Sequence, residues 1–207
     1  MEPKQFEITN MSPINTDINV LVKIIMEEKK KEDDKNIWGN SIYKYLPFLQ
    51  ANNVGKVGEI LIHNLCINNQ INSTIDGTKT KMSGGGDGTI NNKTVEIKTA
   101  LLGSNKSTFQ HELGEHPWNA IYMIFIDIAP DNVYITIFKN FTEEQYKTKK
   151  FKCNPYFPTK SITRRKGVGN FKLDTSININ DKNIKNGYSI KLGDINIKQY
   201  INNKIVL

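Results

Sequence analysis

The stretch GGGDGTINNKTVEIKTA, residues 84–100, decides how this sequence is interpreted. Three glycines precede an acid, a polar turn follows, and a β-branched run then carries an acid and a lysine two positions apart. The turn residues NNK lie between two short segments, 87–90 and 94–100. This arrangement predicts a β-hairpin in which the two segments are the strands. Because side chains alternate along a strand, Glu96 and Lys98 are expected on one face.

The acids of this hairpin are spaced for phosphodiester chemistry. The turn folds Asp87 back toward the strand that carries Glu96, and the preceding glycines leave open space. Two carboxylates offer the oxygen ligands that Mg²⁺ prefers, and the metal polarises a phosphate and lowers the pKa of a bound water. A lysine beside them orients that water or stabilises developing negative charge. A solvent-facing hairpin with an ordinary salt pair would use the same residues, and acid-x-Lys occurs four more times in the chain.

This hairpin resembles the core of the PD-(D/E)XK nuclease superfamily, in which an acid opens one strand and acid-x-Lys lies on the next. Asp87, Glu96 and Lys98 take those places. One departure is that glycine, not proline, precedes Asp87. The resemblance covers residues 54–100 and, more loosely, the strands up to residue 138.

The helix before the hairpin extends the resemblance. Many members of the superfamily carry a glutamate on this helix behind small residues. The segment GKVGEILIHNL has Glu59 at the matching position, preceded by Gly55 and Gly58. A solvent-facing helical glutamate is the alternative for Glu59.

The resemblance implies a Mg²⁺-dependent, sequence-specific endonuclease of double-stranded DNA, similar to type II restriction enzymes. In that case Asp87 and Glu96 would ligate the metal, together with the main-chain carbonyl of Ile97. Lys98 would position the attacking water, and Glu59 would support the metal or a water from further away. A nucleotide cofactor is not expected, because the chain has no G-x-x-x-x-G-K-[ST] motif.

Two other functions stay open. A Holliday-junction or repair nuclease of the same superfamily would share the early glutamate and the Asp…Glu-x-Lys pattern. A non-catalytic DNA-binding protein could keep a nuclease-like fold. The long basic C-terminal region favours sequence-specific cutting, and palindromic targets would favour a homodimer, which no feature of the sequence itself indicates.

The positive charge of the chain is concentrated in its C-terminal half. The net charge is +7, and the segment from residue 146 to residue 172 holds many lysines and arginines and no acid. Basic residues beside aromatics suit phosphate contacts, although a solvated basic loop has the same composition. The DNA-contact candidates in this segment are Lys160, Arg164, Arg165 and Lys166.

The segment FQHELGEHPW, residues 109–118, is predicted to be a loop. Its histidines are five residues apart and a glycine and a proline interrupt it, so it does not fit a His-Glu-x-x-His zinc helix. Because it follows the proposed catalytic strand, Gln110 and His111 are weak candidates for DNA contact.

The pattern of apolar residues predicts an α/β fold with a central mixed β-sheet flanked by helices. The resemblance implies that this sheet and its helices form a restriction-endonuclease-like core. We expect one nuclease domain over residues 1–207, with a catalytic core at 54–138 and a basic DNA-contacting region at 146–207. The predicted helices are 17–34, capped by Thr16, then 54–68, a short one opening at Thr142, and 194–202. The further predicted strands are 119–128, 133–138, 171–177 and 188–192. The second helix is expected to bury Val57, Ile60, Leu61, Leu65 and Cys66.

The cysteines, the N-terminal sequence and the length of the apolar stretches indicate a cytoplasmic protein. Cys66 and Cys153 are isolated from each other in the sequence, which fits neither a zinc knuckle nor a disulfide framework. The N-terminus lacks the basic and then apolar run of a signal peptide. The longest apolar stretch, AIYMIFIDIA, contains Asp127 and is too short to cross a bilayer.

Overall fold

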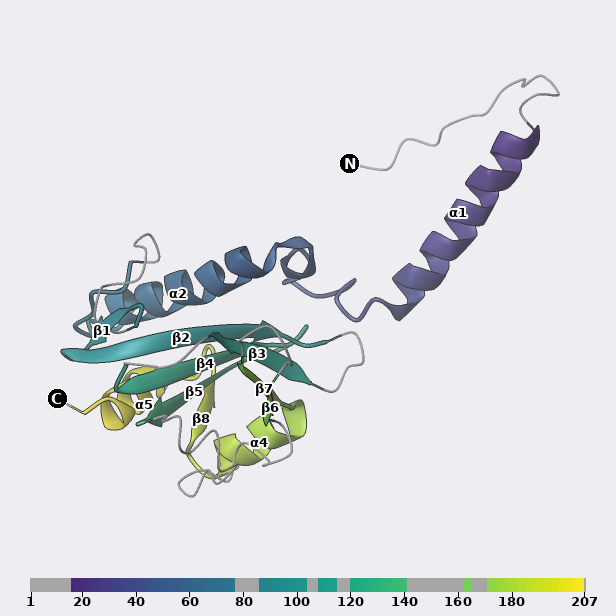
Figure 1. The fold of residues 1–207 in the computed structure, drawn as a ribbon. Helices are drawn as coiled ribbons and strands as arrows, with labels where there is room; N and C mark the ends of the chain where they lie inside the picture. The colour runs from purple at the N-terminus through teal and green to yellow at the C-terminus, as the bar shows by residue number, and fades with distance from the viewer. Residues whose placement is uncertain are drawn as a thin grey trace.

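A five-stranded mixed sheet forms the centre of the fold (Figure 1). The computed structural model describes residues 16–76, 86–103, 108–114, 120–140, 162–164 and 171–206. The strand order is β1-β2-β4-β5-β8, in which β2 and β4 are parallel and the other neighbours are antiparallel. These strands are β1 (Gly88–Ile90), β2 (Lys93–Leu101), β4 (Tyr122–Ile128), β5 (Val133–Lys139) and β8 (Ser189–Lys191). The predicted α/β fold with a mixed sheet and flanking helices is confirmed.

A second, antiparallel sheet packs beside the first, with the order β3-β7-β6. Its strands are β3 (Phe109–Gly114), β7 (Phe171–Thr175) and β6 (Ile162–Arg164). The prediction of a loop over 109–118 is therefore wrong for the first six residues of that range. The β3 segment alternates between buried Phe109, His111 and Leu113 and exposed Gln110 and Glu112, which is the period of a strand.

The helices of the structure are α1 (Thr16–Lys35), η2 (Leu46–Phe48), α2 (Ala51–Asn68), α4 (Ile177–Lys185) and α5 (Ile197–Lys204). None of the helices in the described part of the chain is long and apolar enough to cross a membrane. The α4 helix was not predicted, because its sequence ININDKNIK is rich in asparagine. A cap marks its start, since Ser176 Oγ accepts a hydrogen bond from the amide of Ile179 at 3.3 Å. The predicted short helix at Thr142 lies outside the described residues.

The two faces of the central sheet are covered differently. One face carries Ile124, Ile126 and Ile135, and these join a core with Ile62 of α2 and Ile201 of α5. The other face is covered by β3 and α4, because its Asp127 binds His111 and Asn180. In Figure 1, α2 and α4 accordingly lie on opposite sides of the sheet.

The α2 helix approaches the sheet through a glycine. A Cβ atom at Gly58 would lie 1.9 Å from Thr99 Oγ1 and 3.0 Å from Ile126 Cδ1. The side of α2 that faces the sheet therefore consists of Val54, Gly58, Ile62 and Cys66. The predicted buried stripe was wrong by part of a turn, because only Cys66 of it is fully buried and Ile60 is 38% exposed.

We expect Gly58→Val to lower the free energy of unfolding by about 1–3 kcal/mol, because the added side chain overpacks the contact with Thr99. Gly55→Val on the same helix is the matched control, since nothing lies within 4 Å of a Cβ built there. The control should change stability by no more than about 0.5 kcal/mol. Urea denaturation followed by circular dichroism measures both, and equal midpoints for the two variants would contradict the packing argument.

The β1–β2 hairpin is closed by a two-residue turn. Asn91 and Asn92 have φ of 50° and 61°, and Ile90 pairs with Lys93. Positive φ at both turn residues is the type I′ geometry that asparagine tolerates. Lys93 is consequently the first residue of β2 and not the third residue of the turn, which places Asp87 beside β2 just past Val95.

Candidate active site

Asp87 binds β2 on the edge that pairs with β1, just beyond the end of that pairing. The pairing of β1 with β2 ends at Gly88 and Val95. Beyond it, the amide of Asp87 donates to the Val95 carbonyl at 2.8 Å, and Asp87 Oδ2 accepts from the amide of Ile97 at 2.7 Å. The carboxylate thus satisfies a strand amide that would otherwise have no strand partner, which holds the acid at the level of Glu96 and Lys98.

Glu96 and Lys98 lie on one face of β2, as the alternation of the strand predicts. Lys98 Nζ donates to Glu96 Oε1 at 2.5 Å, and the two side chains are only 18% and 10% exposed. Burial of either charge alone would be costly, so each depends on the other for compensation. The acid-x-Lys pair is therefore an integral part of the sheet edge and not a flexible surface salt bridge.

Glu59 reaches the same place from α2. Its pKa is raised above the ordinary value of 4.5, first by burial and then by the negative charges of Asp87 and Glu96. Lys98 and Lys56 act in the opposite direction. Glu59 of α2 therefore lies close enough to Asp87 and Glu96 for their charges to affect its pKa.

All four groups line a single pocket of about 550 Å³. The α2 helix supplies one wall, the open edge of β2 a second, and β3 a third. The remaining lining residues are Ala51, Asn52, Val54, Gly55, Ile97, Thr99, Ala100, Leu101, Gln110 and Glu112. Acids separated by up to 53 positions in the sequence, from Glu59 to Glu112, thus line one pocket at the sheet edge.

The acids of the pocket are not arranged as a finished three-ligand metal cluster. Among the residues that the structure describes, no three His, Cys, Asp or Glu side chains form such a group. The donor set expected from the sequence needs only two carboxylates, of Asp87 and Glu96, together with a main-chain carbonyl of Ile97. Ile97 lies in the pocket wall with a buried side chain, so only its main chain is available there.

Comparisons with protein-family models, with curated proteins and with solved structures found no match to this chain. What can be said about its activity therefore depends on the residues of the pocket themselves.

The β3 strand directs its two DNA-contact candidates, Gln110 and His111, to opposite sides. Gln110 is exposed in the pocket wall, and its Nε2 donates to Asp174 Oδ1 at 3.1 Å. His111 is fully buried, with Nε2 2.6 Å from Asp127 Oδ1, so its side chain cannot meet DNA and that hypothesis is corrected. Strand alternation directs Gln110 outward and His111 inward.

Glu112 is the acid of the pocket that sequence reasoning missed. It follows His111 in β3 and faces the same side as Gln110. The alternation of polar and apolar residues over FQHELG would have revealed it, had the segment been considered as a strand.

The basic candidates fall mostly outside the described residues. This holds for Lys160, Arg165 and Lys166. Arg164 ends β6, which pairs with β7 through Phe171, but its side chain is not described. Contact of these residues with DNA stays a prediction.

The raised pKa of Glu59 predicts a pH dependence. The folded protein holds the proton of this carboxyl more tightly than the unfolded chain, so the stability it contributes is complete below pH 4.5 and is lost as pH rises through the folded pKa. We expect metal-free Glu59→Gln to be more stable than the wild type at pH 7 and equal to it at pH 4. Urea midpoints at both pH values measure this, with Glu27→Gln on exposed α1 as control. A Glu59→Gln protein less stable at pH 7 would contradict the argument.

Proposed function

We propose that this chain is a Mg²⁺-dependent endonuclease with a restriction-endonuclease-like core, and that it hydrolyses phosphodiester bonds of double-stranded DNA in a sequence-specific manner. The observation that carries the proposal is the common pocket of Glu59, Asp87, Glu96 and Lys98. These acids and the lysine come from α2, from the residue before β1 and from β2. An ordinary salt pair on a solvent-facing hairpin does not require side chains from three segments to share a pocket.

The donor set of the pocket fits a hard divalent cation. Asp87 and Glu96 would hold it, with the carbonyl of Ile97. Burial raises the pKa of Glu59, and repulsion from Asp87 and Glu96 raises it further. That repulsion is a sign of excess negative charge, which a cation relieves. When bound, Mg²⁺ supplies polarisation of a phosphate oxygen and acidification of a bound water.

The side chains divide the remaining work. Asp87 is kept in place by the amide of Ile97, so it offers a fixed carboxylate at the mouth of the pocket. An ammonium has three N–H donors, and the bond from Lys98 to Glu96 uses one. Another can hold a water or a phosphate oxygen in line with the scissile bond, where it stabilises developing charge. Glu59, which takes up a proton more readily than an exposed glutamate, is positioned to orient that water.

The experiment is incubation of the full chain with plasmid DNA, with Mg²⁺ and with EDTA. Discrete fragments that appear only with Mg²⁺ are expected from a sequence-specific enzyme. Cutting restricted to four-way or otherwise branched DNA would indicate a junction-resolving or repair nuclease instead. Tight binding of DNA without cleavage under any metal condition would refute the catalytic proposal and favour a DNA-binding protein.

A further inference from the structure

The N-terminal half of α1 carries apolar side chains into solvent. Every residue from 18 to 36 is exposed, and Figure 1 shows α1 standing clear of the sheet and its other helices. Its apolar residues, with their exposed fractions, are Ile18 52%, Val20 52%, Leu21 56%, Val22 41%, Ile24 50%, Ile25 56% and Met26 68%. They surround most of the helix, a composition typical of a buried helix and not of a solvated one. Most of the stability of a helix in a protein comes from the packing of its apolar side chains, so α1 requires a packing partner.

The body of the protein has an apolar groove beside the base of α1. It has a volume of about 300 Å³. Its lining residues are Ile42, Tyr43, Tyr45, Leu46, Leu49, Val57, Leu61, Ile128, Val133 and Leu192. Ile42 and Tyr45 are 84% and 71% exposed. The volume is at the lower end of the roughly 300–1,000 Å³ of small-molecule sites. The described residues of the lining include no charged group that could orient a small molecule, so the groove suits aliphatic side chains of a helix better.

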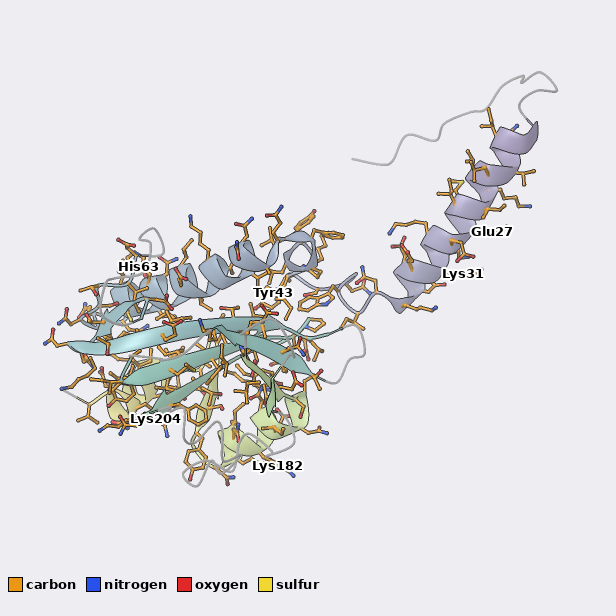
Figure 2. All side chains as sticks on the ribbon, in the orientation of Figure 1. Glu27, Lys31, Tyr43, His63, Lys182 and Lys204 are labelled. Atoms are coloured by element: carbon orange, nitrogen blue, oxygen red, sulfur yellow. The ribbon has the colours of Figure 1, made fainter. Side chains whose placement is uncertain are left out.

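The half of α1 that lies next to the groove of its own chain is the charged half, and the apolar half lies farther away. The segment EEKKKEDDK, residues 27–35, separates the apolar half from the body by about 14 Å of helix. Lys29, Glu32 and Asp33 of this charged half line a small cavity with Lys44 and Phe48, so the charged half is the part next to the body. Figure 2 shows Glu27 and Lys31 in solvent between the body and the apolar half. A straight α1 therefore points its apolar residues away from its own groove.

We propose that the apolar half of α1 docks in the groove of a second copy of this chain, in a reciprocal two-fold exchange. The seven side chains, each about half exposed, offer about 300 Å² of apolar surface per helix. This area is the transfer free energy of the exposed parts of the side chains divided by the free energy per unit of buried area. Two helices and two grooves would bury about four times that area, near the lower limit of roughly 1,200 Å² for specific interfaces. The charged half then bridges the two bodies, held helical by its Lys29–Asp33 and Lys31–Glu28 ion pairs.

The first test is the oligomeric state of the full chain by sedimentation equilibrium over micromolar concentrations. We expect a dimer, and we expect Ile25→Glu in α1 and Ile42→Glu in the groove each to raise its dissociation constant at least about 100-fold, because each buries a charge. Ile195→Glu is the matched control, since Ile195 is 94% exposed and lies on neither surface. It should leave the dimer unchanged.

The second test distinguishes exchange from other pairings. When the two monomeric variants are mixed, the intact helix of Ile42→Glu can enter the intact groove of Ile25→Glu, so a heterodimer should form with one functional contact. A monomeric wild type would overturn the proposal. So would a dimer that Ile42→Glu leaves intact, because α1 would then pair with another surface. Neither substitution touches the pocket of Glu96, so DNA cleavage assays and these measurements can fail independently.

Discussion

Lys98→Ala is expected to lower the rate of Mg²⁺-dependent DNA cleavage by about 10²–10³-fold, the usual cost of removing a donor that stabilises transition-state charge. Among the described residues that line the pocket, Lys98 is the one cation, and it donates directly to Glu96. Glu96→Ala should cost at least as much, because it removes a proposed metal ligand. Both variants are compared with the wild type in single-turnover cleavage of plasmid DNA at saturating protein.

The matched control for Lys98 is Lys93→Ala at the start of the same strand. Lys93 lies outside the pocket lining, so its loss should change the cleavage rate less than about threefold, within the scatter of single-residue effects. Electrophoretic mobility shifts should show that Lys98→Ala still binds DNA. If Lys98→Ala cleaved DNA at the wild-type rate, Lys98 would have no role in the cleavage reaction, even in a correctly folded protein.

Asp127→Ala is expected to destabilise the protein by about 1–3 kcal/mol or more, the cost of leaving buried hydrogen-bonding groups without their partner. Asp127 of β4 accepts from His111 of β3 at 2.6 Å and from Asn180 Nδ2 of α4 at 2.8 Å. All three residues are at most 1% exposed. His111 Nδ1 has no hydrogen-bond partner among the described residues, so loss of Asp127 would leave the imidazole without its bond to a carboxylate.

Asp131→Ala in the exposed β4–β5 turn is the control for Asp127, and its effect should stay within about 0.5 kcal/mol. Asn180→Ala should fall between the two, because it leaves the hydrogen bond between His111 and Asp127 in place. Thermal and urea unfolding measure all three. A loss below about 1 kcal/mol for Asp127→Ala would show that the second sheet is held to the first mainly by apolar contacts such as the edge-to-face packing of His111 on Phe125, whose ring centroids are 4.8 Å apart.

The local elements of the fold were predictable where the sequence pattern was strong. The helix at 17–34, the β4–β5 pair and the hairpin at 87–100 were each predicted to within a few residues. The predictions that failed, the loop at 109–118 and the missing α4, concern short segments rich in polar residues. There, burial of His111 and Asn180 depends on partners from distant segments, and no local periodicity encodes those partners.

The orientation of helices was less predictable than their existence. The spacing of apolar residues could not show that α2 turns Gly58 toward Thr99, because a glycine contributes nothing to an apolar stripe. Likewise, the helix at 17–34 was predicted, but the sequence did not show that the apolar side chains between Ile18 and Met26 are exposed in the structure. Which side of each helix is buried depends on the position of the surface that packs against it, and the spacing of apolar residues does not give that position.

For the candidate site, the sequence by itself determined which residue types were present, and the alternation of β2 placed Glu96 and Lys98 on one face, because strand geometry is local. Only the tertiary structure decided that Asp87 binds the amide of Ile97, that Glu59 shares their pocket, and that Glu112 joins them while His111 turns inward. The physical reason is that these relations depend on the unpaired edge of β2 and on the packing of α2 and β3 around it, and such contacts between distant segments leave no periodic trace in the chain.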